Sequence, residues 1–329
     1  MMLQAANYTA ERTTVEGVDV IHLADAGAQT EVWIAPGFGN NAYSMKVKGQ
    51  EIFWRPAAGL RDWMAKPAQG GNPLLHPWCN RIDQDAYFAN GKKYLLNAGL
   101  NNYRRDGNGK PIHGLVVFAN GWEVTDLSGG GDEAVTTSRL EFSRHPDWLA
   151  QFPWAHNVVM THRLRGGVLE VEMCSKTCLL SQCRFRVIHS LSTLHRRSAR
   201  RMEGPHRKGG DRVAFERADS DRRDKAGRAD PTPLAGGQLD DVFTNLKRDA
   251  DGRSRFSVQG KSQRITVEFG PAYPVGVIYA PPGRGFICFE PMAGVTNVFN
   301  LSHEGKFPLQ SVPAGGEWRE SFWIRPGGF

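Results

Sequence analysis

The chain has 329 residues, of which 40% are hydrophobic and 23% are charged, as is typical of a globular protein. It contains no apolar run of 18 residues, and it begins with a polar segment where a signal peptide needs an apolar one. These features argue against a membrane span and a secretory leader. We therefore expect a cytoplasmic protein whose five cysteines are reduced thiols.

Short segments with strand character follow one another along most of the chain. Several alternate apolar and polar residues with a period of two, as half-buried strands do. The clearest predicted strands are 18–23, 30–34, 157–164, 168–173, 264–269 and 318–324. Turn signals such as Arg165-Gly166-Gly167 and Asp251-Gly252 separate them, and hardly any window has a helical period. The sequence predicts an all-β fold, a single large antiparallel β-sandwich built from residues 1–329.

One segment, from about residue 174 to about residue 230, does not follow this pattern. It holds 15 of the 41 Lys and Arg residues but 7 of the 34 Asp and Glu residues, a net charge of about +8, whereas the remainder has about −1. The sequence pI of 9.2 therefore reflects this segment alone. It shows neither strand alternation nor a helical stripe, and we expect it to form poorly ordered basic coil on the surface.

Three explanations of the segment are open: a disordered insertion, a tract that binds nucleic acid, and translation in the wrong reading frame. A nucleic-acid tract should interleave aromatic and basic residues, but only Phe185 and Phe215 are aromatic between residues 184 and 228, so no nucleic-acid partner is expected. Reverse translation favours the frame error. Codons for residues 176–186, shifted by one nucleotide, allow NLSAEPMPVS and then GHPF. In the opposite shift, codons for residues 195–223 allow an alternating, strand-like sequence, in which Met202-Glu203 necessarily supplies a tryptophan codon.

Four short motifs stand in the strand-like parts of the chain. They are Asn80-Arg81-Ile82, Ile112-His113-Gly114, Leu239-Asp240-Asp241-Val242-Phe243, and the stretch 286–297, which contains Glu290-Pro291 and Thr296-Asn297. Taken singly, Arg81 is explained by an ion pair, His113 by a turn and Asp240 by surface solvation. Glu290 lies in a strongly apolar stretch, where a carboxylate must be either paired or functional.

In this order and spacing, the four motifs resemble the aldose 1-epimerase (galactose mutarotase) family. Phe152-Pro153-Trp154 is also similar to a Tyr-Pro-Phe stretch of that family. The resemblance covers roughly residues 30–173 and 231–326. It implies a large antiparallel β-sandwich and an enzyme that interconverts the α and β anomers of a free aldose. The implied reaction opens and closes the sugar ring by general acid–base catalysis and needs neither a metal nor a cofactor.

The resemblance also implies roles for individual residues. Glu290 would be the base at the anomeric hydroxyl, and the candidate catalytic set is Glu290, His113 and His189. Arg81, Asn80 and Asp240 would bind the sugar oxygens, because hydrogen bonds with charged groups are strong and directional. The family places its acid histidine in His-Pro-Tyr-Phe near position 190. This chain has His189 there without the Pro-Tyr-Phe that should follow.

If the segment is translated out of frame, the strands that it replaces leave apolar surface exposed, and we expect this chain to have low stability. With the acid motif incomplete, we also expect impaired activity. A sugar-binding or sugar-sensing protein without catalysis is the alternative on the same fold. In both cases the expected partner is a small sugar. Whether that sugar is phosphorylated is open at this point, although Arg104 and Arg105, just before His113, are candidates to bind a phosphate.

Overall fold

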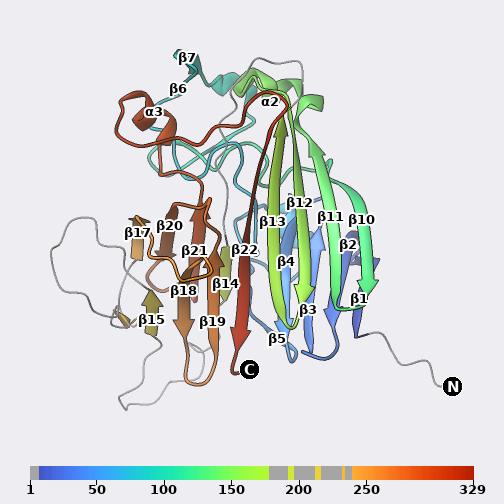
Figure 1. Ribbon diagram of the computed structural model, residues 1–329. Helices are drawn as coiled ribbons and strands as arrows, with labels where there is room; N and C mark the ends of the chain where they lie inside the picture. Colours follow the sequence, from blue (N-terminus) through green and yellow to red (C-terminus); the bar gives the residue numbers. More distant parts are fainter. Residues whose placement is uncertain (1–6, 178–191, 196–211, 216–231, 234–238) are drawn as a thin grey trace.

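The computed structural model describes residues 7–177, 192–195, 212–215, 232–233 and 239–329, and its strands form two layers (Figure 1). A nine-stranded antiparallel sheet is one layer. A five-stranded sheet and a four-stranded sheet lie against its two halves as the other layer. This arrangement confirms the predicted antiparallel β-sandwich.

The sheets draw their strands from distant parts of the sequence. The five-stranded sheet has, in order, β1 (Tyr8–Val15), β2 (Val18–Asp25), β3 (Thr30–Ala35), β4 (Asn41–Val47) and β5 (Gln50–Glu51). The nine-stranded sheet has, in order, β10 (Glu123–Gly130), β11 (Glu133–Glu141), β12 (His156–Arg165), β13 (Val168–Thr177), β22 (Glu317–Gly327), β19 (Arg264–Phe269), β18 (Ser254–Gln259), β15 (Arg212–Phe215) and β16 (Thr232–Pro233). The four-stranded sheet has, in order, β14 (Ser192–His195), β21 (Phe286–Met292), β20 (Val275–Ala280) and β17 (Leu239–Thr244).

Short helices and two hairpins gather mainly at one end of the sandwich, at the top of Figure 1. They are β6 (Ala86–Ala89) with β7 (Lys92–Leu95), β8 (Arg104–Arg105) with β9 (Pro111–Ile112), α2 (Pro146–Gln151), α3 (Val298–His303), and the 3₁₀ turns Ala98–Leu100 and Phe142–Arg144. A further helix, α1 (Leu60–Ala65), follows β5. Within the described residues, no helix has the length and apolar character needed to cross a membrane.

Each of the six clearest predicted strands is a strand in the structure. The period of two is visible in their burial, because inward side chains of β12 and β13 are buried while the alternating ones are partly exposed. Gly166 and Gly167 both adopt positive φ in the turn between these two strands, a conformation that glycine adopts without steric cost. The predicted turn at Gly166 and Gly167 therefore lies where β12 and β13 meet, with Arg165 opposite Val168.

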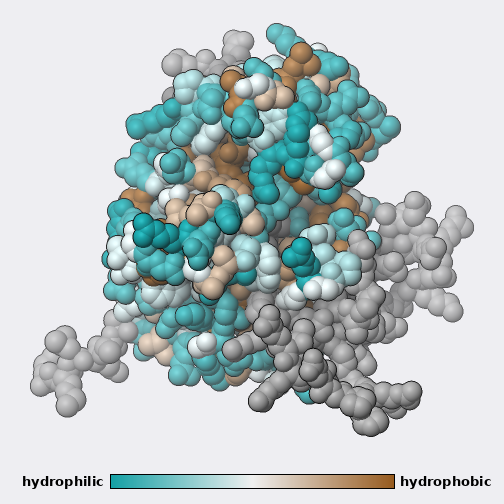
Figure 2. Space-filling view, turned by 180° about the vertical axis from the view of Figure 1, so that it is seen from behind, coloured by the Kyte–Doolittle hydropathy of each residue, from teal (hydrophilic) through white to brown (hydrophobic). Residues whose placement is uncertain are grey.

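The core fills the space between the layers. Ile34 on β3, Val158 on β12 and Phe289 on β21 belong to one continuous cluster, and all are fully buried. Burying an apolar side chain of this size stabilises the fold by roughly 1.5–3 kcal/mol. Seen from behind, the described surface is largely hydrophilic, with apolar atoms visible in a recess near its middle (Figure 2).

The anomalous segment begins later than the sequence predicts. β13 continues through Thr177, and Cys174, Ser175 and Thr177 are buried between β12 and β22, so regular pairing extends past the predicted break at Cys174. Two four-residue strands, β14 and β15, lie within the segment and pair with β21 and β18, where coil was expected. The remaining residues up to 230 (178–191, 196–211 and 216–230) lie outside the described part of the chain.

Candidate active site

The Asn80-Arg81-Ile82 motif lies beside the Ile112-His113-Gly114 motif. The His113 N–H donates to the Asn80 carbonyl oxygen at 2.9 Å, and Arg81 forms an antiparallel bridge with Ile112. Asn80 adopts a φ of +49°, a left-handed conformation that asparagine tolerates better than most residues. Two motifs that are about thirty residues apart in the sequence are thus joined by their backbones.

Gly114 explains why a glycine follows the histidine. Its φ is +68°, and a Cβ at this position would lie 2.1 Å from the carbonyl oxygen of His76. That oxygen accepts hydrogen bonds from the N–H groups of Leu115 and Val116, so the two segments cannot move apart. His113 itself has a φ of +66°, a conformation that costs energy in a non-glycine residue and is found preferentially at functional sites.

His113 is held as a neutral imidazole with a defined orientation. The Gln69 Nε2 amide lies 2.8 Å from Nδ1, and an amide nitrogen can only donate, so Nδ1 accepts and the ring proton sits on Nε2. Burial, together with the positive charges of Arg104 and Arg81, lowers the pKa of His113 to about 3. His113 is therefore a neutral hydrogen-bond donor at physiological pH and carries no proton to give as an imidazolium.

Arg81 is oriented by two partners. Its Nε donates to Asp106 Oδ2 at 2.5 Å, and its Nη1 donates to the Asn80 side-chain oxygen at 3.0 Å. Asp106 is in turn held by the N–H groups of Asn108 and Lys110. The ion pair confirms that Arg81 has a structural role, and the side chain is still 39% exposed, which leaves part of the guanidinium accessible to a ligand.

One face of the four-stranded sheet brings the third and fourth motifs together. Tyr279 on β20 is opposite Asp240 on β17 and Cys288 on β21, and Val277 is opposite Glu290. Residues that are opposite each other in antiparallel strands project on the same face, as do residues two apart in one strand. Asp240 and Glu290 therefore project from the same face in adjacent rows.

Glu290 is buried without compensation. It is 7% exposed, and no side chain or backbone group in the described residues gives its carboxylate a hydrogen bond or an ion pair. Burial and the negative charge of Asp240 raise the pKa of Glu290 to about 8, against a smaller opposing effect of Arg81. A carboxyl group that titrates this close to neutral pH is suited to transferring a proton.

Asn297, in the last motif, connects the two halves of the site. Its N–H donates to the Arg81 carbonyl oxygen at 2.9 Å, and its side-chain oxygen accepts from the Asp83 N–H at 3.1 Å. The charge of Arg81 also acts on both His113 and Glu290. Backbone contacts and the charges that act between them thus link Asn80, Arg81, His113, Asp240 and Glu290, whose roles at a site stay predictions.

Solved structures with similar folds come from several bacteria. A galactose mutarotase-like protein from Clostridium acetobutylicum has a TM-score of 0.79 at 18% identity, over 98% of this chain and 99% of that chain. A galactose 1-epimerase from Lactobacillus acidophilus has a TM-score of 0.68 at 11% identity, over 99% of this chain and 100% of that chain. The chain has the galactose mutarotase-like fold.

A putative aldose 1-epimerase from Escherichia coli K12 has the same mutarotase-like fold, with a TM-score of 0.65 at 13% identity over 98% of this chain and 100% of that chain. No protein-family model and no curated protein matches the sequence. At these identities the structural similarity shows the fold alone. The activity of this mutarotase-like chain therefore has to be argued from its own residues.

Two groups of residues complete the account of the candidate site. His189, one of the predicted catalytic residues, lies outside the described residues. Gln69 and Asn297 orient the site but were not among the predicted site residues; the only sequence signal is that Asn297 ends the fourth motif. Within the described residues, no group of His, Cys, Asp and Glu side chains is arranged to hold a metal ion.

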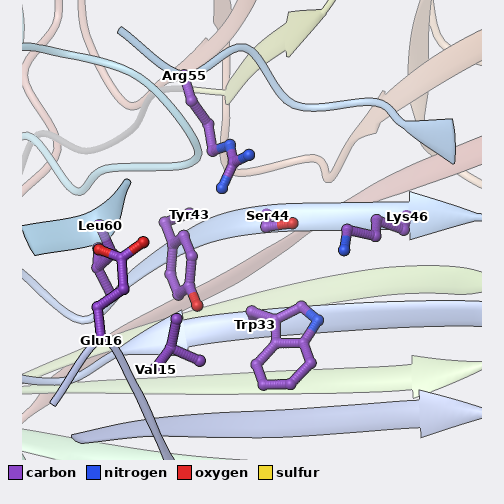
Figure 3. A pocket seen from close by; sticks show the side chains of 8 residues that line it. All are labelled: Val15, Glu16, Trp33, Tyr43, Ser44, Lys46, Arg55 and Leu60. Carbon is purple, nitrogen blue, oxygen red and sulfur yellow. The ribbon is translucent and has the colours of Figure 1, made fainter. Parts of the chain in front are cut away.

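A separate cavity of about 150 Å³ lies over β3 and β4 and involves none of the predicted site residues (Figure 3). It is lined by Val15, Glu16, Trp33, Tyr43, Ser44, Lys46, Arg55 and Leu60. Burial raises the pKa of Tyr43 to about 12. The lining residues on β3 and β4 belong to the five-stranded sheet, whereas Glu290 lies on β21 in the four-stranded sheet.

Proposed function

We propose that this chain is an aldose 1-epimerase, which interconverts the α and β anomers of a sugar by general acid–base catalysis. The single observation that carries the proposal is Glu290, a buried carboxyl group that has no ion-pair partner among the described residues and a pKa of about 8. The fold and the four motifs in their expected order support it. We expect the protein to act in the cytoplasm on a small sugar, without a cofactor.

The proposed reaction assigns each group a task. Ionised Glu290 removes the proton from the anomeric hydroxyl while an acid protonates the ring oxygen, and the C1–O5 bond breaks to give the open-chain aldehyde. Rotation about C1–C2 exposes the other face of the carbonyl group, and the reverse proton transfers close the ring. The Nε2–H of His113 and the guanidinium of Arg81 donate to sugar oxygens, and Asp240 accepts from a sugar hydroxyl.

The test is the Glu290→Gln variant, in which the amide retains the size of the side chain but cannot accept the proton. We expect the rate of anomer exchange, measured by nuclear magnetic resonance on an equilibrated aldose, to fall by about 10²–10⁴-fold. Sugar affinity, measured by calorimetry, should change little. A wild-type chain that binds sugar without exchanging anomers faster than buffer would instead establish the non-catalytic sugar-binding protein.

A matched pair of variants controls for general damage to the sheet. Asp240→Asn removes a charge from the face that carries Glu290, whereas Asp241→Asn removes a charge from the adjacent residue, which projects on the opposite face. Both side chains are exposed. The proposal predicts loss of exchange activity in the first variant and near-normal activity in the second. Equal effects of the two would argue against a site on this face.

We also propose that the basic segment between residues 174 and 230 is translated out of frame, so that the chain lacks its intact acid motif and has weak activity. Resequencing the gene between codons 170 and 235 tests this directly. Two small insertions or deletions that restore a His-Pro-Tyr-Phe-like stretch would support the proposal. Confirmation of the written frame would overturn it and leave a genuine basic insertion. Cooperative melting together with high turnover of this exact chain would also count against it.

A further inference from the structure

Two arginines flank Ile112 at the edge of the site. Arg104 on β8 is opposite Ile112 on β9, and Arg81 forms an antiparallel bridge with the same residue from the other side. Because residues opposite each other in antiparallel pairs project on the same face, the side chains of Arg81 and Arg104 leave this small three-stranded unit on one side. His113 follows Ile112 directly in the chain.

The arginines in this region differ in whether their charge is compensated. Arg81 pairs with Asp106, and Arg105 pairs with Asp85 and also donates to the Tyr103 hydroxyl and the Gly109 carbonyl oxygen. Arg104 has no hydrogen bond or ion pair with any residue that the structure describes. Its guanidinium lies 5.4 Å from the centre of the Phe118 ring, a cation–π contact that orients the group without neutralising it.

The unpaired charge acts on the site. Arg104 is the strongest of the charges that act on His113, and with Arg81 it helps to keep this imidazole neutral. No corresponding effect of Arg104 reaches Glu290, on which Asp240 and Arg81 act instead. Asp240 and Arg81 thus act on Glu290, whereas Arg81 and the unpaired Arg104 act on His113.

We propose that the aldose taken by this site carries a negatively charged oxyanion group, a phosphate or a carboxylate, and that Arg104 binds this group. The inference rests on the proposed function above, because Glu290 then fixes the position of the anomeric carbon. The end of the sugar away from C1, where such a substituent is attached, reaches toward Arg104. The planar fork of a guanidinium matches both phosphate and carboxylate oxygens, and Phe118 already holds it in place.

The experiment compares three substrates with the full chain: glucose, glucose 6-phosphate and glucuronate. We expect kcat/KM for at least one charged sugar to exceed that for glucose by about 10-fold or more, mainly through a lower KM. Arg104→Gln should abolish this preference, with a loss of about 10–100-fold for the charged sugar and little change for glucose. The substrate whose preference is lost identifies the group as phosphate or carboxylate.

Arg105→Gln is the matched control, because it removes the adjacent positive charge from a residue that already has partners. It should leave all three substrates unchanged. If Arg104→Gln and Arg105→Gln lose the preference for charged sugars equally, the preference arises from the general positive charge of this region and the inference is overturned. Equal kcat/KM of the wild type for glucose and both charged sugars would also overturn it.

Failure of the proposed function is distinguishable from failure of the inference. If no sugar is turned over, the epimerase proposal fails, and calorimetric binding of the same three sugars to the wild-type and Arg104→Gln chains still decides the question. Tighter binding of a charged sugar that depends on Arg104 supports the inference without catalysis. Equal affinity for all three sugars, or an affinity that does not depend on Arg104, overturns it.

Discussion

Two buried glutamates, Glu268 on β19 and Glu290 on β21, are treated in opposite ways by the same protein. Glu268 is 3% exposed and accepts hydrogen bonds from Arg253 Nη1 at 2.7 Å and from Arg325 Nε at 2.9 Å. Arg255 Nε is a third positive neighbour, at 3.6 Å from Glu268 Oε1. Burial raises its pKa, but these arginines outweigh burial and the net shift is downward. Glu290, 7% exposed, has no such partners among the described residues, and its pKa rises to about 8.

The difference separates a structural carboxylate from a chemical one. A carboxylate that only supports the fold is stable when its charge is fully paired, as at Glu268. A group that must gain and lose a proton during a reaction needs two protonation states of similar free energy near neutral pH. Glu290 meets that requirement because its surroundings leave its charge largely uncompensated. Burial alone would not have distinguished the two residues.

The largest stability effect predicted from this comparison is the pH dependence introduced by Glu290. Its folded-state pKa of about 8 lies above the ordinary value of 4.5. Below pH 4.5 the carboxyl group is protonated in both the folded and the unfolded chain and has no effect on stability. As the pH rises from 4.5 toward 8, ionisation stabilises the unfolded chain first, so the folded protein loses stability. Relative to the wild type, Glu290→Gln should therefore gain stability across that window, by about 1.4 kcal/mol for each unit of pKa difference. Denaturant unfolding at a series of pH values measures the gain.

A stability difference between the Glu290→Gln and wild-type chains that stays constant between pH 4.5 and 8 would contradict this prediction. It would mean that Glu290 has an ordinary pKa in the folded protein. The exposed carboxylate Glu304 provides the matched control, because Glu304→Gln makes the same substitution at an exposed position.

A smaller effect of the opposite sign is expected at Glu268. Glu268→Gln leaves the arginines around it without their carboxylate, and because they are partly exposed, water compensates them in part. We expect a loss of about 2 kcal/mol at neutral pH. Since the folded-state pKa of Glu268 is lowered, the loss should shrink as the pH falls through that value.

Thermal or denaturant melting of the Glu268→Gln chain checks this prediction. The protein that remains folded should retain its anomer-exchange activity, because Glu268 lies on a strand outside the four-stranded sheet that carries Glu290. Loss of exchange activity without loss of stability would contradict the assignment of Glu268 to structure alone.

The strands could be predicted from the sequence because their information is local. Alternation of apolar and polar residues in β12 and β13, with glycines between them, determines both the strands and their turn. The site motifs were also predictable, although each had a second, structural explanation. For Arg81 the structural explanation is confirmed by its ion pair with Asp106, while its binding of a sugar stays a prediction. Asp240 is exposed, as ordinary solvation predicts, and still projects on the face of Glu290.

Contacts between distant segments were not predictable. Gln69 fixes the tautomer of His113 across 44 residues, and Asn297 holds the Arg81 backbone from the other end of the chain. Neither contact has a periodic or spacing signal, because each depends on how two loops meet after folding. The same reason applies to Arg104 and Arg105, adjacent in sequence and both basic, of which only Arg105 has an ion-pair partner among the described residues.

The most direct measurement of the central claim is the pH dependence of anomer exchange by the wild-type and Glu290→Gln chains. If ionised Glu290 is the base, kcat/KM of the wild type rises with pH and levels off above about pH 8, while the variant stays near the buffer rate throughout. A wild-type rate that is independent of pH between about 6 and 9, or a variant that retains most of that rate, would contradict the claim.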